Sequence, residues 1–240
     1  MKEFIRLCDH ASLVPCLFST GGGAAAITDR LGWLGTQVAE DNLLDLPDLE
    51  YKGKAWQDVR TALNRAGKQG IEFRLVTLAD QRWALVRQVE ELSQEWLGDK
   101  GLPEMGFTLG GVTEALDPAT RVGLAVDQAG LVHGVTSWLP IYTAGGVITG
   151  WPLDLMRRRD GGFKSVMEFL IASSCTAFRD EGAAVVSLSG APLARSARPA
   201  ADTAIGRLMD SLGAALEPVY GSARCPRSRA SSSHAANRCT

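Results

Sequence analysis

Apolar and polar positions follow two different periods along this chain. In several stretches apolar residues recur every three to four positions, which is typical of amphipathic helices; after residue 80, for example, Trp83 and Val86 share one helical face. Asp80 is predicted to cap that helix and Gly98 to end it. Another helix is expected after the three glycines at 21–23. The other predicted helices span residues 2–12, 52–68, 163–179 and 203–216.

Alternating or continuous apolar stretches predict the strands. Residues 121–127, 131–142 and 147–155 are separated by turns at Gly130 and at Gly145-Gly146, which indicates a three-stranded antiparallel meander. The order strand, helix, meander, helix, strand, helix is that of an α/β (α+β) fold of the N-acetyltransferase kind, with a mixed, mostly antiparallel sheet flanked by helices. The remaining predictions are strands at 14–18, 71–77, 105–109 and 183–189 and a connector at 45–48.

Composition indicates a globular protein. The chain has 240 residues, 45% of them apolar, and a formal charge of −2, so it can bury one substantial core or two smaller ones. Its apolar runs are far shorter than the roughly 18 to 20 residues that cross a bilayer. Its first residues mix charges before any long apolar region, unlike a secretory signal. We therefore expect a cytoplasmic location and no transmembrane segment in this chain.

The five cysteines are scattered and form no Cys-x-x-Cys pair, and the chain has three histidines. Cys8, Cys16 and Cys175 lie among apolar neighbours, where a reduced cysteine acts as a small hydrophobe. The sequence therefore predicts neither a disulfide framework nor a metal site.

The segment 150–162 carries the strongest candidate chemistry. An apolar strand pattern ends in Asp154 and the arginines 157–159, and Asp160-Gly161-Gly162 then leads into a helix. Cations beside a carboxylate can hold an anionic or ester-bearing substrate and orient an amine. We expect Asp154 to hold an ammonium group and Arg157, one helical turn away if the backbone has begun to coil, to contact a phosphate or an ester oxygen. The alternative is a surface ion pair that caps the following helix.

Further substrate-binding candidates flank this segment. Glu104, in a Pro-Glu-Met-Gly-Phe stretch, and Glu168, on the helix after the arginines, each have a carboxylate that can bind an amine, although Glu168 also fits the polar side of its helix. Arg158 is a further candidate for an anionic group. His133 could act as a catalytic base, but a single histidine on an alternating strand is better explained as a half-exposed residue without a catalytic role.

The segment 187–190 resembles a nucleophile elbow, but that motif needs a glycine where Ser187 stands. A covalent serine mechanism is therefore disfavoured. The hydroxyl of Ser189 and the backbone amides around Gly190 are instead predicted to cradle the substrate at the end of the strand.

Several spaced motifs together resemble the catalytic domain of phosphatidylglycerol lysyltransferases, from about residue 4 to Tyr220. Asp154 and Arg157 match the Asp-x-x-Arg signature of that family. Several motifs in one order are much more specific than any one of them. The segments that carry the resemblance are residues 38–40, 53–60, 103–110, 153–157 and 187–193.

The resemblance implies two fused acetyltransferase-like halves that move a lysyl or alanyl group from aminoacyl-tRNA to the head-group glycerol of phosphatidylglycerol, a bacterial membrane lipid. Residues 1–50 are then a truncated first unit and residues 51–220 the second unit. It implies no cofactor beyond the aminoacyl-tRNA co-substrate. Family members usually carry a membrane region ahead of this domain, so we expect a peripheral position at the inner face of the cell membrane and a membrane-embedded partner.

A basic helix offers a site for the tRNA. Its cations accumulate against a single acid, Asp58, and an acceptor stem is bound mainly through its phosphates. A solvated helix face is the alternative. The predicted tRNA-binding residues are Lys52, Lys54, Arg60, Arg65 and Lys68.

Three other functions remain open. An acetyl-coenzyme A-dependent N-acetyltransferase would hold pyrophosphate on a loop such as 158–163, but Phe163 occupies the place of the last small residue. A peptidoglycan-type aminoacyltransferase shares the tRNA donor and a related fold. An inactive truncated remnant is the third.

The tail at 221–240 contains no Val, Ile, Leu, Phe, Met or Trp, so it is predicted to be disordered. Family members typically continue from a similar Tyr-Gly into an aromatic and lysine-rich segment. We hypothesise a frameshift here, which would weaken transferase activity.

Overall fold

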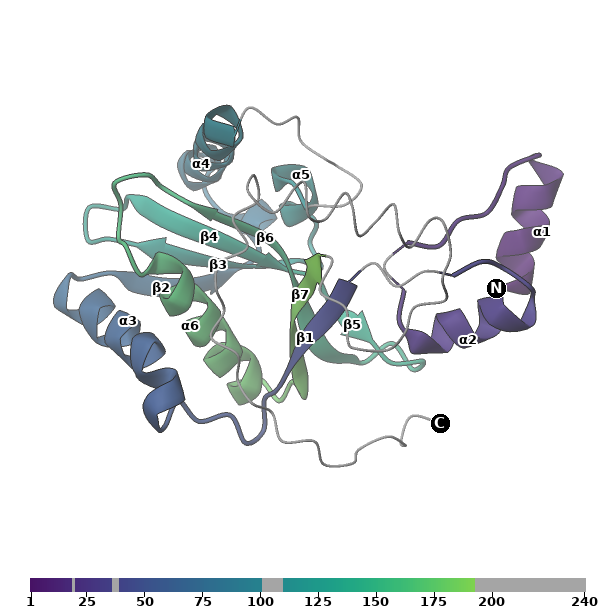
Figure 1. The fold of residues 1–240 in the computed structure, drawn as a ribbon. Helices are drawn as coiled ribbons and strands as arrows, with labels where there is room; N and C mark the ends of the chain where they lie inside the picture. The colour runs from purple at the N-terminus through teal and green to yellow at the C-terminus, as the bar shows by residue number, and fades with distance from the viewer. Residues whose placement is uncertain (19, 36–38, 101–109, 193–240) are drawn as a thin grey trace. The chain divides into compact units, whose positions relative to one another are not determined.

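The computed structural model describes residues 1–18, 20–35, 39–100 and 110–192 (Figure 1). The chain divides into two compact units, and the larger one contains Asp41–Ser189. The smaller unit includes Met1–Glu40 and carries helices α1 (Lys2–His10) and α2 (Gly22–Arg30), as the sequence predicts. The domain boundary at residue 50 stays a prediction.

The strand predicted at 14–18 is wrong. Its described residues form no regular structure, and Val14 is 93% exposed. Apolar β-formers in so short a segment become a strand only when a neighbouring strand satisfies their backbone groups. Two predictions, the strand at 105–109 and the helix at 203–216, lie outside the described residues.

The larger unit is built on one seven-stranded sheet. Its order is β1-β7-β6-β4-β3-β2, and β5 pairs with β6. The pairs from β2 to β6 are antiparallel and β6 with β7 is parallel, which confirms the mixed, mostly antiparallel sheet and the central meander. The strands are β1 (Ala39–Asp45), β2 (Glu72–Val76), β3 (Arg121–Val126), β4 (Val132–Trp138), β5 (Ile141–Tyr142), β6 (Ile148–Arg158) and β7 (Val185–Pro192).

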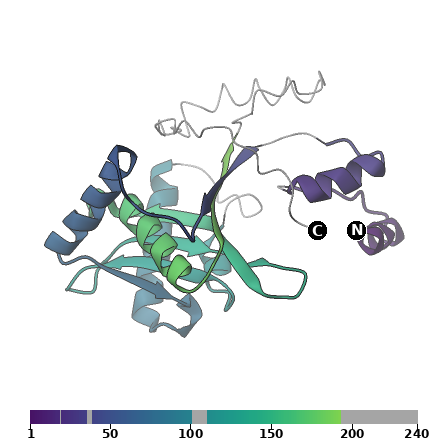
Figure 2. The same ribbon diagram turned by 90° about the horizontal axis from the view of Figure 1, so that it is seen from below.

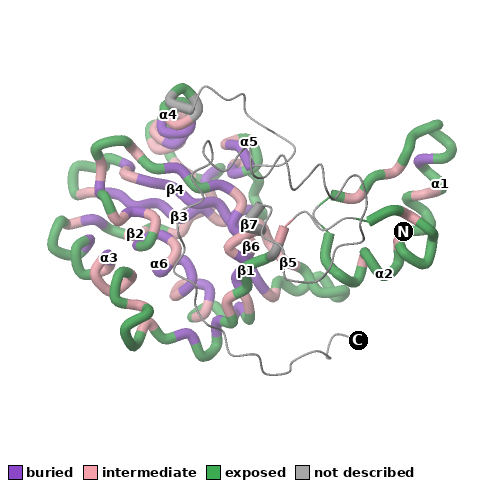
Figure 3. Tube along the Cα trace, in the orientation of Figure 1, coloured by how far each residue is buried: buried purple, intermediate pink, exposed green. Residues whose placement is uncertain are grey.

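Helices cover both faces of this sheet (Figures 1 and 2). The helices α3 (Gln57–Lys68) and α6 (Val166–Asp180) lie on one face, and α4 (Trp83–Lys100) and α5 (Val112–Ala115) on the other. Strand alternation divides the core accordingly: Leu124 packs toward α4 and α5, and its neighbour Ala125 packs toward α3 and α6. The buried strands between the two helical layers are visible in Figure 3.

Two predicted boundaries of the helix after residue 80 are wrong. Asp80 ends a short 3-10 helix, Leu78–Asp80, and α4 begins at Trp83. Gly98 lies inside α4, which continues to Lys100. A β-carbon at Gly98 would meet nothing within 4 Å. A glycine inside a helix costs about 1 kcal/mol relative to alanine, which is not enough to end a helix that packs on a sheet.

Strand β1 has no counterpart in the predicted elements. Its sequence, Ala-Glu-Asp-Asn-Leu-Leu-Asp, lacks β-branched residues and carries three acids, so propensity alone argues against a strand. It lies beside β7 at the sheet edge, and the chain after it is tied down by the Leu46 N–H, which donates to the carbonyl of Ala184 over 2.9 Å. The partner strand decides its conformation.

Among the described residues, no helix is both long and apolar enough to cross a membrane.

Candidate active site

A β-bulge in β6 shapes the site. Ser137 of β4 pairs with Leu155 of β6, but the next residue, Trp138, pairs with Leu153. Asp154 is therefore an extra residue on β6, with no pairing partner on β4. In such a bulge the usual alternation of side chains is interrupted once.

The bulge brings Asp154 and Arg157 to the same face of the sheet. Leu155 packs into the core cluster of α4 and α5, and Arg157, two residues later, points the same way. The carboxyl group of Asp154 lies against Gly110, at the start of the turn into α5, so it also faces α5. In a regular strand, residues three apart point to opposite faces. The expected helical turn between the two residues is wrong, since both lie on a strand, and the bulge joins them instead.

The carboxyl group of Asp154 is partly buried. Burial raises its pKa, and the negative charge of Glu114 on α5 adds to the rise, whereas the hydrogen bond from Ser137 and the charge of Arg157 lower it. The Ser137 hydroxyl donates to Asp154 Oδ2 over 3.4 Å. A β-carbon at Gly110 would overlap the carboxyl group, so the turn covers it closely. A bound cation would offset the cost of ionising this buried acid.

Arg157 is buried as well, with 6% of its surface exposed. Its guanidinium carbon lies 3.8 Å from the ring centroid of Trp96 on α4, a close cation–π contact, and its Nη1 donates to the carbonyl of Met156 over 3.0 Å. Helix α6 begins at Val166, so neither Arg157 nor Asp154 lies at its first turn. This position does not fit a surface ion pair that caps the helix.

The other predicted substrate-binding residues are placed differently. Ser189 of β7 lies next to the bulge, because its hydroxyl donates to the carbonyl of Leu153; its φ is 65°, a conformation that few non-glycine residues adopt. Gly190 follows it in β7. Arg158 is exposed and leaves β6 on the opposite side from Arg157.

The two predicted glutamates do not join Asp154 among the described residues. Glu168 is exposed on α6, which packs on the other face of the sheet. Glu104 lies outside the described residues. A carboxylate on α5, Glu114, is near Asp154 instead, where its side chain accepts a hydrogen bond from the Gly111 N–H over 2.9 Å.

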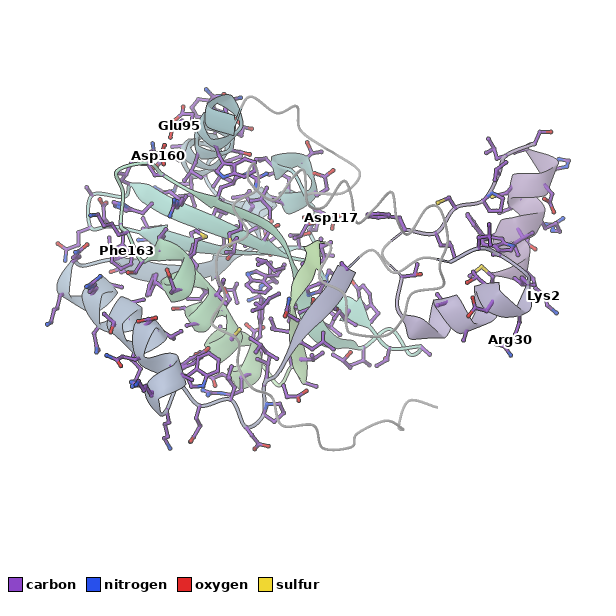
Figure 4. All side chains as sticks on the ribbon, in the orientation of Figure 1. Lys2, Arg30, Glu95, Asp117, Asp160 and Phe163 are labelled. Atoms are coloured by element: carbon purple, nitrogen blue, oxygen red, sulfur yellow. The ribbon has the colours of Figure 1, made fainter. Side chains whose placement is uncertain are left out.

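A second polar region lies at the start of α6, on the other face of the sheet. The Phe163 side chain, labelled in Figure 4, is buried, and its N–H donates to His133 Nδ1 over 3.2 Å. His133 Nε2 lies 3.1 Å from Asp127 Oδ2. His133 therefore has both ring nitrogens in contact with the protein, which fits a structural neighbour better than a base. An open pocket of about 420 Å³ beside it is lined by Arg65 of α3, by Gln69 directly after that helix, by His133 and by residues 161–165.

The cations predicted to bind tRNA differ in their surroundings: some contact other groups of the protein, and others are exposed without an ion pair in the described part of the chain. Arg60 is half-buried, and its Nη1 donates to the carbonyls of Tyr51 and Gly53 over 2.8 and 2.7 Å, so it fixes the loop before α3. Lys52 forms an exposed ion pair with Glu50 over 2.7 Å. The cations of this set that are exposed and have no ion pair among the described residues are Lys54, Arg65 and Lys68.

Sequence reasoning missed the residues that surround Asp154 and Arg157. Ser137, Gly110 and Trp96 come from a strand, a turn and a helix that are separate in the chain, and neither Ser137 nor Trp96 belongs to one of the quoted motifs. Gly110 had one signal, since it closes the family-like segment 103–110. Among the described residues, no group of three His, Cys, Asp or Glu is arranged to hold a metal ion.

Comparison with known proteins identifies related sequences. The sequence matches the family described as phosphatidylglycerol lysyltransferase, C-terminal, over residues 1–228. It is 47% identical over 185 residues to an uncharacterized protein of Corynebacterium glutamicum, which aligns over 77% of this chain and 23% of that protein. It is 27% identical over 189 residues to the lysylphosphatidylglycerol biosynthesis bifunctional protein LysX of Nocardia farcinica, over 79% of this chain and 16% of LysX. The chain thus spans less than a quarter of the length of either relative.

A solved structure has a similar fold. The structure of L-PGS from Bacillus licheniformis matches with a TM-score of 0.69 at 21% identity, over 81% of this chain and 60% of that one. At that identity the likeness concerns the fold alone.

Proposed function

The chain belongs to the family of phosphatidylglycerol lysyltransferase C-terminal domains, and from that membership we propose that it transfers a lysyl or alanyl group from aminoacyl-tRNA to a glycerol hydroxyl of phosphatidylglycerol. The family resemblance of the spaced motifs is thereby confirmed. The observation that carries the proposal is the pairing of Asp154 and Arg157 on one buried face, brought together by the bulge of β6.

Each of the two side chains has a role in the proposed reaction. A lipid hydroxyl attacks the carbonyl of the aminoacyl ester; a new C–O bond forms to the lipid, the C–O bond to the tRNA ribose breaks, and the hydroxyl proton ends on the ribose oxygen. The Asp154 carboxylate holds an ammonium group of the amino acid, which compensates the cost of its burial. The Arg157 guanidinium, whose central carbon lies 3.8 Å from the ring centroid of Trp96, presents N–H donors to the carbonyl oxygen as negative charge develops on it.

The tRNA donor is supported by the exposed cations near α3. Lys54, Arg65 and Lys68 are free to meet phosphates, and Arg65 also lines the pocket of about 420 Å³ beside residues 161–165. Arg60 and Lys52 support it less, because each already contacts another group of the protein. Peripheral attachment to the inner face of the membrane and a membrane-embedded partner belong to the same proposal.

An acetyl-coenzyme A-dependent reaction is the second candidate, since the pocket at 161–165 lies where a pyrophosphate would meet the start of α6. The internal hydrogen bond from the Phe163 N–H to His133 argues against it, because that amide is not available to a phosphate. Titration calorimetry with acetyl-coenzyme A separates the two: no heat of binding is expected.

The test is transfer of a labelled amino acid. The protein is incubated with labelled lysyl-tRNA or alanyl-tRNA and vesicles that contain phosphatidylglycerol, beside Asp154→Ala and a matched control, Glu72→Gln, which removes an exposed charge paired with Arg74. Labelled lipid is expected from the wild type and the control and not from Asp154→Ala. Labelling of a cell-wall precursor instead would favour the peptidoglycan-type reaction. If no acceptor is labelled, the alternative of an inactive truncated remnant is favoured.

A further inference from the structure

We propose that Ser137 is a positioning residue for Asp154: its hydroxyl holds the bulge of β6 together and fixes the carboxyl group on the face that α4 and α5 cover. The inference deepens the proposed function and rests on it as far as the reaction is concerned. The placement of the carboxyl group is measurable without the reaction.

The hydroxyl of Ser137 joins the two halves of the bulge. Ser137 is completely buried, and its Oγ accepts a hydrogen bond from the Leu155 N–H over 3.1 Å. Leu155 directly follows Asp154, the extra residue of the bulge. With this acceptor site used, the hydroxyl proton is directed to Asp154 Oδ2, 3.4 Å away, a long contact for an O–H donor. One atom therefore ties the backbone of the bulge to the side chain that the bulge presents.

No other described group performs this task. Among the described residues, Ser137 is the one side chain that donates a hydrogen bond to the Asp154 carboxyl group. In the part of the chain that the structure describes, the charged groups that act on Asp154 are Glu114 from α5 and Arg157 from β6 itself; from α4, Trp96 lies against Arg157. Gly110 limits the space on the remaining side. Serine fits because a larger side chain at this buried position would displace Asp154 or Leu155.

Removing the hydroxyl has two separable consequences. The Leu155 N–H loses its acceptor, so the bulge is less well defined. The pKa of Asp154 rises further, because a hydrogen bond that favours the ionised form is gone while burial and Glu114 still oppose ionisation.

The test compares Ser137→Ala with Ser174→Ala. Ser174 is an equally buried serine on α6 whose hydroxyl has no hydrogen-bond partner among the described residues, so it controls for loss of a buried hydroxyl. The titration of the Asp154 carboxyl carbon is followed by carbon-13 NMR, with the signal assigned from Asp154→Asn. The midpoint is expected at higher pH in Ser137→Ala and unchanged in Ser174→Ala. Equal midpoints in all three proteins would overturn the proposal.

A second variant covers the case in which Ser137→Ala does not fold. Ser137→Cys keeps a side chain of similar size with a weaker donor and acceptor, so an intermediate midpoint is expected. A midpoint equal to that of the wild type would again contradict the positioning role.

Kinetics connect the placement to the reaction. In the transfer assay, the acid limb of kcat/KM against pH is expected to move to higher pH in Ser137→Ala, because Asp154 must be ionised to hold an ammonium group. An unmoved limb with a shifted NMR midpoint would reject the link to the reaction. If the wild type transfers nothing, the proposed function fails, and the NMR comparison still decides the role of Ser137.

Discussion

The two faces of the sheet treat ionisable groups in opposite ways. On the face covered by α4 and α5, a partly buried acid and a buried guanidinium lie beside Leu155. On the face covered by α3 and α6, the core consists of alanine, phenylalanine and other apolar side chains, and the cations of α3 are exposed or donate to carbonyls. An apolar core with exposed cations, as on the face covered by α3 and α6, is what stability alone requires. The acid and the guanidinium on the face covered by α4 and α5 are not needed for stability.

Burying charge without need reduces stability, because desolvation is repaid only in part by nearby groups. The α4/α5 face therefore holds the Asp154 carboxyl group and the Arg157 guanidinium at a cost in folding free energy, whereas the ionisable pair described on the other face, His133 and Asp127, is in direct contact. That contrast is the physical argument that Asp154 and Arg157 serve a reaction.

The strongest test of the contrast is Asp154→Asn. Because the pKa of Asp154 is raised, its native state loses stability as the pH rises through that pKa, whereas below the ordinary pKa of an aspartate nothing is lost. The variant should therefore have a higher Tm than the wild type at pH 8 and the same Tm at the acid end, as measured by calorimetry across pH. Transfer should fall by about 30-fold or more, since removing the charge of Asp154 from its proposed pair with the substrate ammonium costs about 2–5 kcal/mol and each 1.4 kcal/mol is about tenfold. A Tm difference that does not change with pH would break the comparison.

A pair of glycine substitutions sharpens it. Gly110→Ala would drive a β-carbon into the Asp154 carboxyl group, so transfer should fall by about tenfold while the protein stays folded. Gly98→Ala is the matched control, because it adds a methyl group to open space in α4 and should stabilise the helix by up to about 1 kcal/mol without changing transfer. Transfer rates and urea unfolding of both variants give the answer. Equal transfer rates would mean that the turn at Gly110 does not hold the carboxyl group in place.

The smallest effects are expected on the other face. Arg60→Ala should lower the free energy of unfolding by about 2 kcal/mol, because two carbonyls lose a charged donor. Arg65→Ala should change it by less than about 0.5 kcal/mol but weaken tRNA binding and reduce the salt dependence of that binding by about one phosphate contact. Denaturant titrations and binding isotherms at several salt concentrations separate the two. If Arg60→Ala weakened tRNA binding and Arg65→Ala did not, the tRNA contact would belong to Arg60, and its proposed place at Arg65 would be wrong.

Local sequence patterns predicted most of the larger unit. The meander and the helices α3, α4 and α6 follow from periods of two and 3.6 residues, which each segment carries within itself. The failures share a cause. Strand β1 forms against its propensity because β7 is beside it, and residues 14–18 do not form a strand although their propensity favours one.

For the candidate site, the sequence by itself determined which two residues to examine, since Asp154 and Arg157 stand out by residue type and by motif. Only the tertiary structure decided that they share a face. A bulge is a mismatch between the numbers of residues on two paired strands, so it exists in the register of β4 against β6 and in neither segment alone. The same holds for Ser137, Gly110 and Trp96, which meet Asp154 and Arg157 only because the sheet, a turn and a helix pack together.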